Sequence, residues 1–191
     1  MTANDTFLEL RPLERVTGRS GRPGATDPRV DLSIERLTYA DLPHVIAIER
    51  RSFPAPWSLA MFVLELSKPG GICLGARHRG ELVGYLVCSR YHTVWHLMNV
   101  AVDPAYRRLR IATSLIDRLF GEADRPGERY TLEVRVSNSE AIGMYESFGF
   151  RSAGIRRRYY HDNNEDALIM WRSAGAATRE RRAGERRRAR R

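Results

Sequence analysis

The stretch Tyr130–Phe150 reads Y-T-L-E-V-R-V-S-N-S-E-A-I-G-M-Y-E-S-F-G-F. Its first part alternates apolar residues around Glu133, which is typical of a strand with one polar face. From Ser139 the apolar positions follow helical spacing, and they place Tyr145 on the inward stripe of a helix that Gly149 ends. This stretch therefore predicts a strand leading directly into a helix, with an acid on the first and a phenol on the second.

The rest of the chain extends this pattern to a whole fold. Apolar spacing and turn residues predict the order β-α-α-β-β-β-α-β-α-β-β, so we expect an α/β (α+β) fold in which helices cover a mixed sheet. We expect about seven strands and about four helices. The predicted strands begin near 32 and cover 72–77, 82–91, 94–102, 129–134, 155–160 and 167–171; the predicted helices cover 41–53, 108–122 and 139–148, with one more starting at 58.

Composition divides the chain into three parts. Residues 1–31 mix Gly, Pro, Arg and Thr without an apolar period, which predicts a flexible arm. Residues 32–171 form the expected folded domain. Residues 172–191 contain nine Arg and two Glu, so this tail carries +7 of the formal net charge of +9. The basic charge therefore describes the tail more than the domain, and a solubilising role competes with weak attraction to ribosomal RNA.

Three features bear on the compartment. No apolar run approaches the roughly 18 residues of a membrane span. The N-terminal segment lacks the basic start and apolar core of a secretory signal. Cys73 and Cys88 lie in apolar, strand-like runs, which favours buried free thiols over a disulfide or a metal site. His92 and His96 are four residues apart, but in a strand, where that spacing does not suit a metal. We expect a cytoplasmic protein without a metal or a membrane contact.

A second segment, Asn99–Leu115, has the features of a phosphate site. It reads N-V-A-V-D-P-A-Y-R-R-L-R-I-A-T-S-L, a strand, a turn and a helix start. The free N–H groups and positive dipole end of a helix N-terminus attract phosphate, and three arginines add charge. An ordinary amphipathic helix with a basic start remains the alternative.

This segment resembles the acetyl-CoA motif of the GNAT acetyltransferases, Gln/Arg-x-x-Gly-x-Gly/Ala. Arg107 stands at the first position and Ala112 at the last, but Arg110 replaces the middle Gly. If the backbone at Arg110 is helical, the arginine is tolerated; if its φ is positive, binding of the donor is weakened. The resemblance implies that acetyl-CoA binds at Val100, Ala101, Val102, Arg107, Arg108, Leu109, Arg110, Ile111, Ala112 and Thr113.

The chain also resembles one branch of that superfamily, the ribosomal-protein-alanine N-acetyltransferases (RimI). The likeness covers about residues 33–171 and rests on Tyr130–Phe150, on F-P-A-P-W-S, on I-R-R-R-Y-Y and on E-D-A-L-I-M. It implies transfer of acetyl from acetyl-CoA to the α-amino group of a protein N-terminus, with the N-terminal alanine of a small-subunit ribosomal protein as the acceptor. Glu133 would be the base and Tyr145 the acid, by direct attack in a ternary complex.

The residue types suit this chemistry. An α-amino group has a pKa near 8 and must lose a proton before it attacks, which a carboxylate can accept directly or through water. Backbone N–H groups of residues 100–102 would stabilise the oxyanion, as the family resemblance implies, and a phenol can protonate the leaving thiolate. Alternatives stay open: Glu133 paired with Arg135 or another arginine, and Tyr145 as a core residue.

Asn138 has two roles open to it. It precedes the predicted helix 139–148 as an N-cap, and in the family an Asn here contacts the cofactor; Ser137 with Glu140 would form an alternative capping box.

The acceptor would lie between the early helices and the last strand pair. The candidates for its walls are Phe53, Pro54, Trp57, Tyr159 and Tyr160, with hairpin packing as the alternative for the two tyrosines. Two other functions remain open: acetylation of lysine ε-amines or of a broad range of N-termini, and a CoA-binding, ribosome-associated module with weak catalysis. We expect a monomer or a weak dimer.

Overall fold

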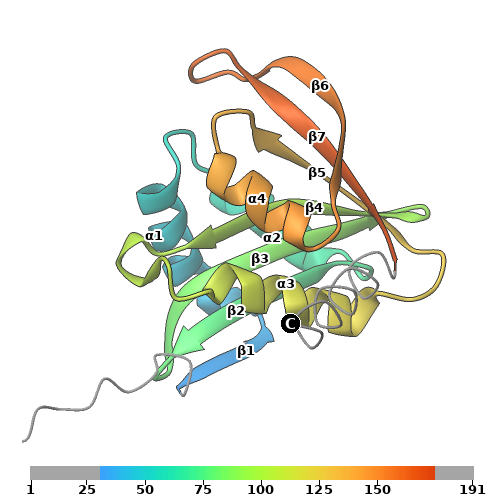
Figure 1. Cartoon of the computed structure of the whole chain (residues 1–191). Coiled ribbons are helices and arrows are strands. Elements are labelled where there is room, and N and C mark those ends of the chain that lie inside the picture. Colours follow the sequence, from blue (N-terminus) through green and yellow to red (C-terminus); the bar gives the residue numbers. More distant parts are fainter. Residues whose placement is uncertain (1–30, 175–191) are drawn as a thin grey trace, which may run out of the picture.

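The computed structural model describes residues 31–174, which form a seven-stranded sheet and four α-helices (Figure 1). The strand order is β1-β2-β3-β4-β5-β7-β6, and all neighbours are antiparallel except β4 and β5. This confirms the mixed sheet and the predicted order of elements. The strands are β1 Leu32–Arg36, β2 Ile72–His78, β3 Glu81–Tyr91, β4 Val94–Val102, β5 Arg129–Arg135, β6 Arg151–Tyr160 and β7 Glu165–Ser173; the helices are α1 Leu42–Ser52, α2 Leu59–Ser67, α3 Ile111–Ala123 and α4 Ser139–Ser147.

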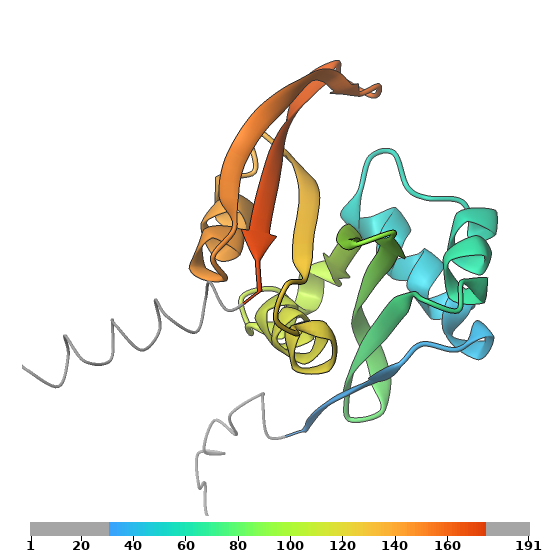
Figure 2. The same cartoon turned by 90° about the vertical axis from the view of Figure 1, so that its right-hand side faces the viewer.

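The helices cover the two faces of the sheet in pairs (Figure 2). Helices α1 and α2 lie on one face, and α3 and α4 lie on the other. Each pair buries its own apolar core against the strands. Cys73 belongs to the α1/α2 core and Cys88 to the α3/α4 core, so the two buried free thiols lie on opposite faces. The prediction of free thiols is confirmed. No helix within residues 31–174 is long and apolar enough to cross a membrane.

Strands β4 and β5 stay together only briefly. Their parallel pairing joins Val94–His96 to Arg129–Thr131 and goes no further. Beyond His96, β4 continues beside β3, while β5 continues beside β7. The sheet therefore opens between β4 and β5, and the opening begins just after His96.

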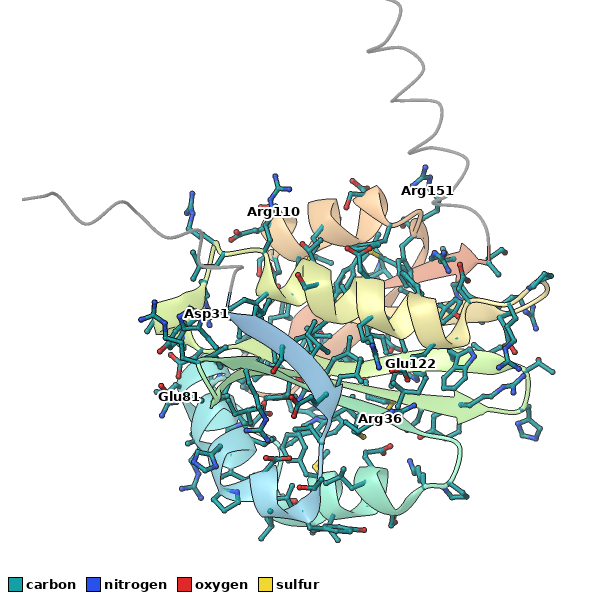
Figure 3. The ribbon with its side chains drawn as sticks, turned by 90° about the horizontal axis from the view of Figure 1, so that it is seen from below. Asp31, Arg36, Glu81, Arg110, Glu122 and Arg151 are labelled. Carbon is teal, nitrogen blue, oxygen red and sulfur yellow. The ribbon has the colours of Figure 1, made fainter. Side chains whose placement is uncertain are left out.

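Helix α3 begins later than its sequence suggests. The expected helix from residue 108 instead starts at Ile111, with Arg110 as its N-cap. Arg108 and Arg110 both have positive φ, 67° and 60°. A left-handed residue interrupts the repeat of the right-handed helix, so the basic segment forms a loop before α3. Further along, Glu122 of α3 pairs with Arg36 of β1 at 2.6 Å (Figure 3).

The boundary of the tail also needs correction, because Arg172 is part of the fold. It lies in β7 with its side chain 2% exposed. Its guanidinium donates to both carboxylate oxygens of Asp124 at 2.8 Å and to the carbonyl oxygen of Phe148 at 2.9 Å, and it lies 3.8 Å from the centre of the Phe120 ring. These contacts compensate for the burial of its charge. The arm predicted before Asp31 and the tail after residue 174 lie outside the described residues.

Candidate active site

Glu133 and Tyr145 lie on opposite faces of the sheet. Leu132 and Val134 belong to the α3/α4 core, so the side chain of Glu133 between them faces the α1/α2 side. Tyr145 of α4 belongs to the α3/α4 core itself. The open seam, where β4 and β5 part after His96, lies in the sheet between these two faces.

Glu133 is held by two basic side chains. Its Oε2 lies 2.5 Å from Nε2 of His96, and its Oε1 lies 3.3 Å from Nη1 of Arg156. The hydrogen bond with His96 is the main cause that holds the pKa of Glu133 below its usual value, and it outweighs the opposing effect of burial. The pairing with Arg135 considered from the sequence is wrong, because Arg135 binds acids of the β6–β7 hairpin; a nearby arginine, Arg156, does pair with Glu133.

Tyr145 is enclosed by apolar side chains. It is 9% exposed, and its ring meets that of Phe150 edge to face at a centroid distance of 5.8 Å. Burial raises the pKa of its phenol well above the usual value, so the group keeps its proton at neutral pH. The inward position predicted from the helical stripe is confirmed, and a neutral phenol there can serve as a proton donor.

The seam itself supplies backbone donors. Within the described residues, no strand pairs with β4 on its β5 side beyond His96, so Val100, Ala101 and Val102 lie along an open edge. Ala101 packs on the α1/α2 core, whereas Val100 and Val102 pack against the α3/α4 core. An unpaired strand edge suits an oxyanion, because the N–H groups that point away from β3 have no strand partner there.

The basic loop leads from this edge into α3. Nε of Arg107 donates to the carbonyl oxygen of Val102 at 3.4 Å, which ties the loop to the end of β4. Arg108 and Arg110 are exposed, and Figure 3 shows Arg110 pointing outward at the start of α3. Leu109 and Ile111 pack on the α3/α4 core, and the half-buried Ala112 and Thr113 form the first turn of the helix. Of the two backbone conformations considered for Arg110, the structure adopts the positive φ.

Asn138 lies at the start of the second helix on this side of the sheet. Its Oδ1 accepts a hydrogen bond from the Ala141 N–H at 3.1 Å, so it is the N-cap of α4. The alternative capping box is not formed, because the Ser137 N–H donates to Glu165 instead. The two helices α3 and α4 thus begin near the same end of the seam, with α3 preceded by the basic loop.

A buried carboxylate outside the predicted site lies on the α1/α2 face. Glu49 of α1 is 1% exposed and accepts hydrogen bonds from the Trp57 N–H at 2.7 Å, from the Asn99 amide at 3.3 Å and from the Tyr85 hydroxyl. Burial, and then the charge of Glu49, raise the pKa of Tyr85 well above its usual value. The carboxylate thereby fixes the α1–α2 loop against β3 and β4. Its position on the apolar stripe of α1, beside buried Val45 and Ile48, is the sequence signal that indicates a buried acid.

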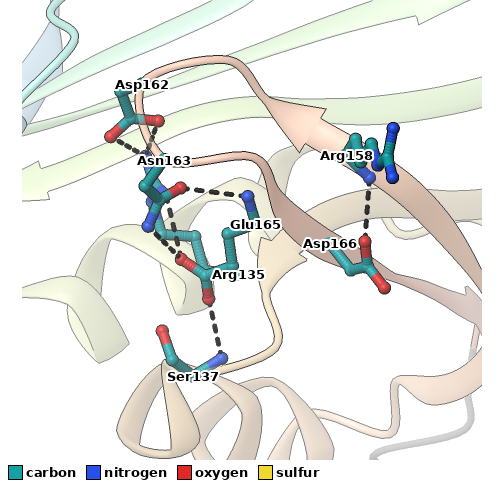
Figure 4. A network of polar contacts seen from close by, with 7 residues as sticks. All are labelled: Arg135, Ser137, Arg158, Asp162, Asn163, Glu165 and Asp166. Carbon is teal, nitrogen blue, oxygen red and sulfur yellow. Dashed lines mark hydrogen bonds and ion pairs between the residues drawn. The ribbon is translucent and has the colours of Figure 1, made fainter.

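The β6–β7 hairpin is fixed by a polar network beside this face (Figure 4). Arg135 donates to both oxygens of Asp162 at 2.8 Å and to Glu165 at 3.0 Å, and its guanidinium lies 3.9 Å from the centre of the Tyr160 ring. Tyr159 and Tyr160 meet edge to face at 5.1 Å. The two tyrosines therefore pack within the hairpin, which is the alternative considered for them. Both are only half-buried, so their rings can still contact a ligand.

A family model matches the part of the chain that contains the basic loop, Glu133 and Tyr145. Residues 42–150 match the model described as the acetyltransferase (GNAT) family.

Curated proteins and solved structures give the same result. The chain is 38% identical over 150 residues to the N-alpha-acetyltransferase RimI of Mycobacterium tuberculosis, covering 75% of this chain and 94% of the relative. It is 37% identical over 143 residues to the ribosomal protein bS18-alanine N-acetyltransferase of Escherichia coli, covering 72% and 95%. The crystal structure of the Escherichia coli ribosomal-protein-S18-alanine N-acetyltransferase superposes with a TM-score of 0.70 at 34% identity, covering 75% of this chain and 94% of that one.

Proposed function

Because this chain belongs to the acetyltransferase (GNAT) family, we propose that it transfers acetyl from acetyl-CoA to the α-amino group of a protein N-terminus. The chain is an acyltransferase, and its acceptor in this proposal is the N-terminal alanine of a small-subunit ribosomal protein. The activity of the Escherichia coli relative, a ribosomal protein bS18-alanine N-acetyltransferase, supports this acceptor. The observation that carries the mechanism is the placement of Glu133 and Tyr145 on the two faces of one open seam.

The donor approaches from the α3/α4 face in this reaction. The loop of residues 107–110 and the start of α3 bind the phosphates of acetyl-CoA, with Asn138 beside them at the start of α4. The thioester carbonyl lies against Val100, Ala101 and Val102, and the N–H groups of this segment that point into the seam stabilise the tetrahedral oxyanion. Tyr145 then protonates the sulfur of the departing CoA.

The acceptor approaches from the α1/α2 face. Its ammonium loses a proton toward Glu133, directly or through water, and the free amine attacks the thioester carbon. Phe53, Trp57 and the Tyr159–Tyr160 pair line the approach. Glu49 supports this wall, since it holds the backbone of Trp57. One bond to nitrogen forms and one bond to sulfur breaks, without an acyl-enzyme.

The test compares two peptides that differ only in which amine is free. The first starts with alanine and has no lysine; the second has an acetylated N-terminus and one internal lysine. We expect turnover on the first alone, and about a 100-fold loss of kcat in Glu133→Gln and in Tyr145→Phe. Turnover on the second peptide alone would replace the proposal by lysine acetylation. Binding of acetyl-CoA without turnover on either would overturn it.

The cellular setting belongs to the same proposal. With a ribosomal-protein acceptor, the enzyme acts in the cytoplasm in this proposal, and we propose a monomer or weak dimer. We further propose a weak contact of the Arg-rich tail with ribosomal RNA, on a segment outside the described residues. Cosedimentation with ribosomes should then fall steeply with salt for the full chain and be much weaker for a variant that ends at residue 174. Equal cosedimentation of the two chains would refute a role for the tail.

A further inference from the structure

The buried carboxylate of Glu49 has partners from three separate parts of the fold. Its Oε1 accepts a hydrogen bond from the Trp57 N–H, in the loop between α1 and α2, at 2.7 Å. The Asn99 amide of β4 donates to both of its oxygens, at 3.3 and 3.4 Å, and the Tyr85 hydroxyl of β3 donates to Oε2. All of these partners are donors, which is the set that a buried carboxylate requires. One side chain of α1 therefore ties the loop to two strands of the sheet.

Asn99 immediately precedes the segment that faces the oxyanion in the proposed function. After that segment, the Asp103 N–H donates to the Val83 carbonyl oxygen of β3 at 2.9 Å. Successive N–H groups of a strand point to opposite sides, so those of Val100 and Val102 point away from β3 and into the open seam. Asn99 and Asp103 thus bracket the N–H groups that the oxyanion would meet.

The last turn of α1 holds both ends of this segment. Glu49 binds Asn99, and Arg51, two residues later, donates from Nε to Oδ2 of Asp103 at 3.0 Å. The Arg51 side chain is 53% exposed, whereas Glu49 is fully buried. An exposed ion pair contributes little and is screened by salt. The buried carboxylate is therefore the contact of α1 that fixes the segment.

The loop held by Glu49 forms one wall of the acceptor site in the proposed function. The Trp57 ring packs on Phe62 of α2 at a centroid distance of 5.3 Å, and Phe62 meets Tyr85 edge to face at 5.4 Å. Figure 1 and Figure 2 both show this loop at the same end of the molecule as the turn of the β6–β7 hairpin. Trp57 is thus held at its ring by the α1/α2 core and at its backbone by Glu49. A wall that is ordered before the peptide arrives lowers the entropy cost of binding.

We propose that Glu49 is a positioning residue that sets the acceptor loop and the oxyanion segment relative to each other. This inference rests on the proposed function and adds a residue to it. Because Glu49 is fully buried, it touches neither substrate. It acts through Trp57 on the peptide and through Asn99 on the edge that faces the thioester. A displacement of about 1 Å in the groups that align two reactants can cost about 100-fold in rate.

The two contacts of Glu49 predict different kinetic effects. Loss of the Trp57 contact loosens the acceptor wall in the ground state, so the peptide KM should rise. Loss of the Asn99 contact disturbs the oxyanion segment, which acts in the transition state, so kcat should fall. A carboxylate with a structural role alone predicts neither pattern, because a smaller folded fraction lowers the apparent kcat and leaves KM unchanged.

The experiment measures kcat and peptide KM for the full chain on the alanine-starting peptide, at saturating acetyl-CoA. Glu49→Gln keeps the size of the side chain and replaces one acceptor oxygen by a donor. We expect its KM to rise about tenfold and its kcat to fall about tenfold. Asn99→Leu leaves the Trp57 contact in place, so its kcat should fall about tenfold while its KM stays within about twofold.

Tyr85→Phe is the matched control. It removes one hydroxyl from the same carboxylate and leaves the contacts with Trp57 and Asn99. We expect a lower Tm, with kcat and KM both within about twofold of the wild type. The Kd of acetyl-CoA by isothermal titration should also stay within about twofold in all three variants, because the basic loop binds the donor on the opposite face.

An unchanged peptide KM in Glu49→Gln would overturn the inference, and so would an equal rise of KM in Tyr85→Phe. If Glu49→Gln does not fold, the wild type and Asn99→Leu decide. The Trp57 amide should then exchange slowly with deuterium by NMR, and Asn99→Leu should lower kcat alone; fast exchange or an unchanged kcat would overturn the inference.

The wild type separates this inference from the proposed function. Turnover on the lysine peptide alone would refute the proposed acceptor, and the same comparison of KM and kcat on that peptide would then decide the role of Glu49. Turnover on the alanine-starting peptide with wild-type constants in Glu49→Gln would overturn this inference alone. No turnover on either peptide would overturn both.

Discussion

Arg110 provides a test of what its left-handed backbone costs. The residue is exposed, has φ 60° and ψ 20°, and precedes the first turn of α3. A side chain with a Cβ in this region costs about 1–2 kcal/mol, and glycine avoids that cost. Arg110→Gly relieves it, whereas Arg110→Ala removes the same charge and keeps the Cβ. Comparing the two variants therefore separates backbone strain from electrostatics.

The expected difference follows from opposing terms. Relief of the left-handed conformation stabilises the Gly variant by about 1–2 kcal/mol, and the greater freedom of its unfolded chain takes back roughly 0.4–1 kcal/mol. The Gly variant should exceed the Ala variant by about 1 kcal/mol in free energy of unfolding. For a chain of this size that is about 2–4 °C in Tm, measured by calorimetry without ligand.

Donor binding gives the second readout of the same pair. A Cβ at position 110 hinders close approach of a phosphate to the loop backbone, so Arg110→Gly should bind acetyl-CoA more tightly than Arg110→Ala by isothermal titration. Equal melting temperatures for the two variants would refute the strain. An equal or weaker affinity of the Gly variant would refute the idea that Arg110 weakens donor binding.

Three further perturbations follow from the contacts. Arg172→Met leaves Asp124 without its bidentate partner and should cost about 3–5 kcal/mol of unfolding free energy by chemical denaturation; the exposed control Arg129→Met should stay within about 0.5 kcal/mol, and similar values for both would contradict a structural Arg172. Tyr145→Phe removes only the hydroxyl and keeps the ring packed on Phe150, so Tm should change little. Because the proton donor is lost, kcat in the peptide assay should fall about 100-fold, and an unchanged kcat would exclude the phenol as the acid. The hydrogen bonds from Ser137 and Arg135 lower the pKa of Glu165 from 4.5 to about 2, so its stabilisation is complete above pH 4.5 and is lost as the pH falls toward 2. The difference in Tm between wild type and Glu165→Gln should close over that window, and a constant difference would contradict this linkage.

The sequence predicts the elements better than their cross-strand contacts. Alternation around Glu133 and the stripe containing Tyr145 are local patterns, and both placed their side chains on the correct faces. The contact of His96 with Glu133 joins residues 37 apart on parallel strands, so no short-range pattern indicates it. Arg172 falls in the predicted tail because the apolar pattern of the last strand ends at Trp171, whereas its partners, Asp124 and Phe148, come from distant segments.

The parting of β4 and β5 also bears on how products leave. In the proposed reaction, CoA withdraws on the α3/α4 side, and the acetylated chain end withdraws on the α1/α2 side. Because the two exit routes lie on opposite faces, either product can dissociate while the other is still bound. The geometry imposes no obligatory order of release, and a slowly dissociating CoA would not trap the finished polypeptide on the enzyme.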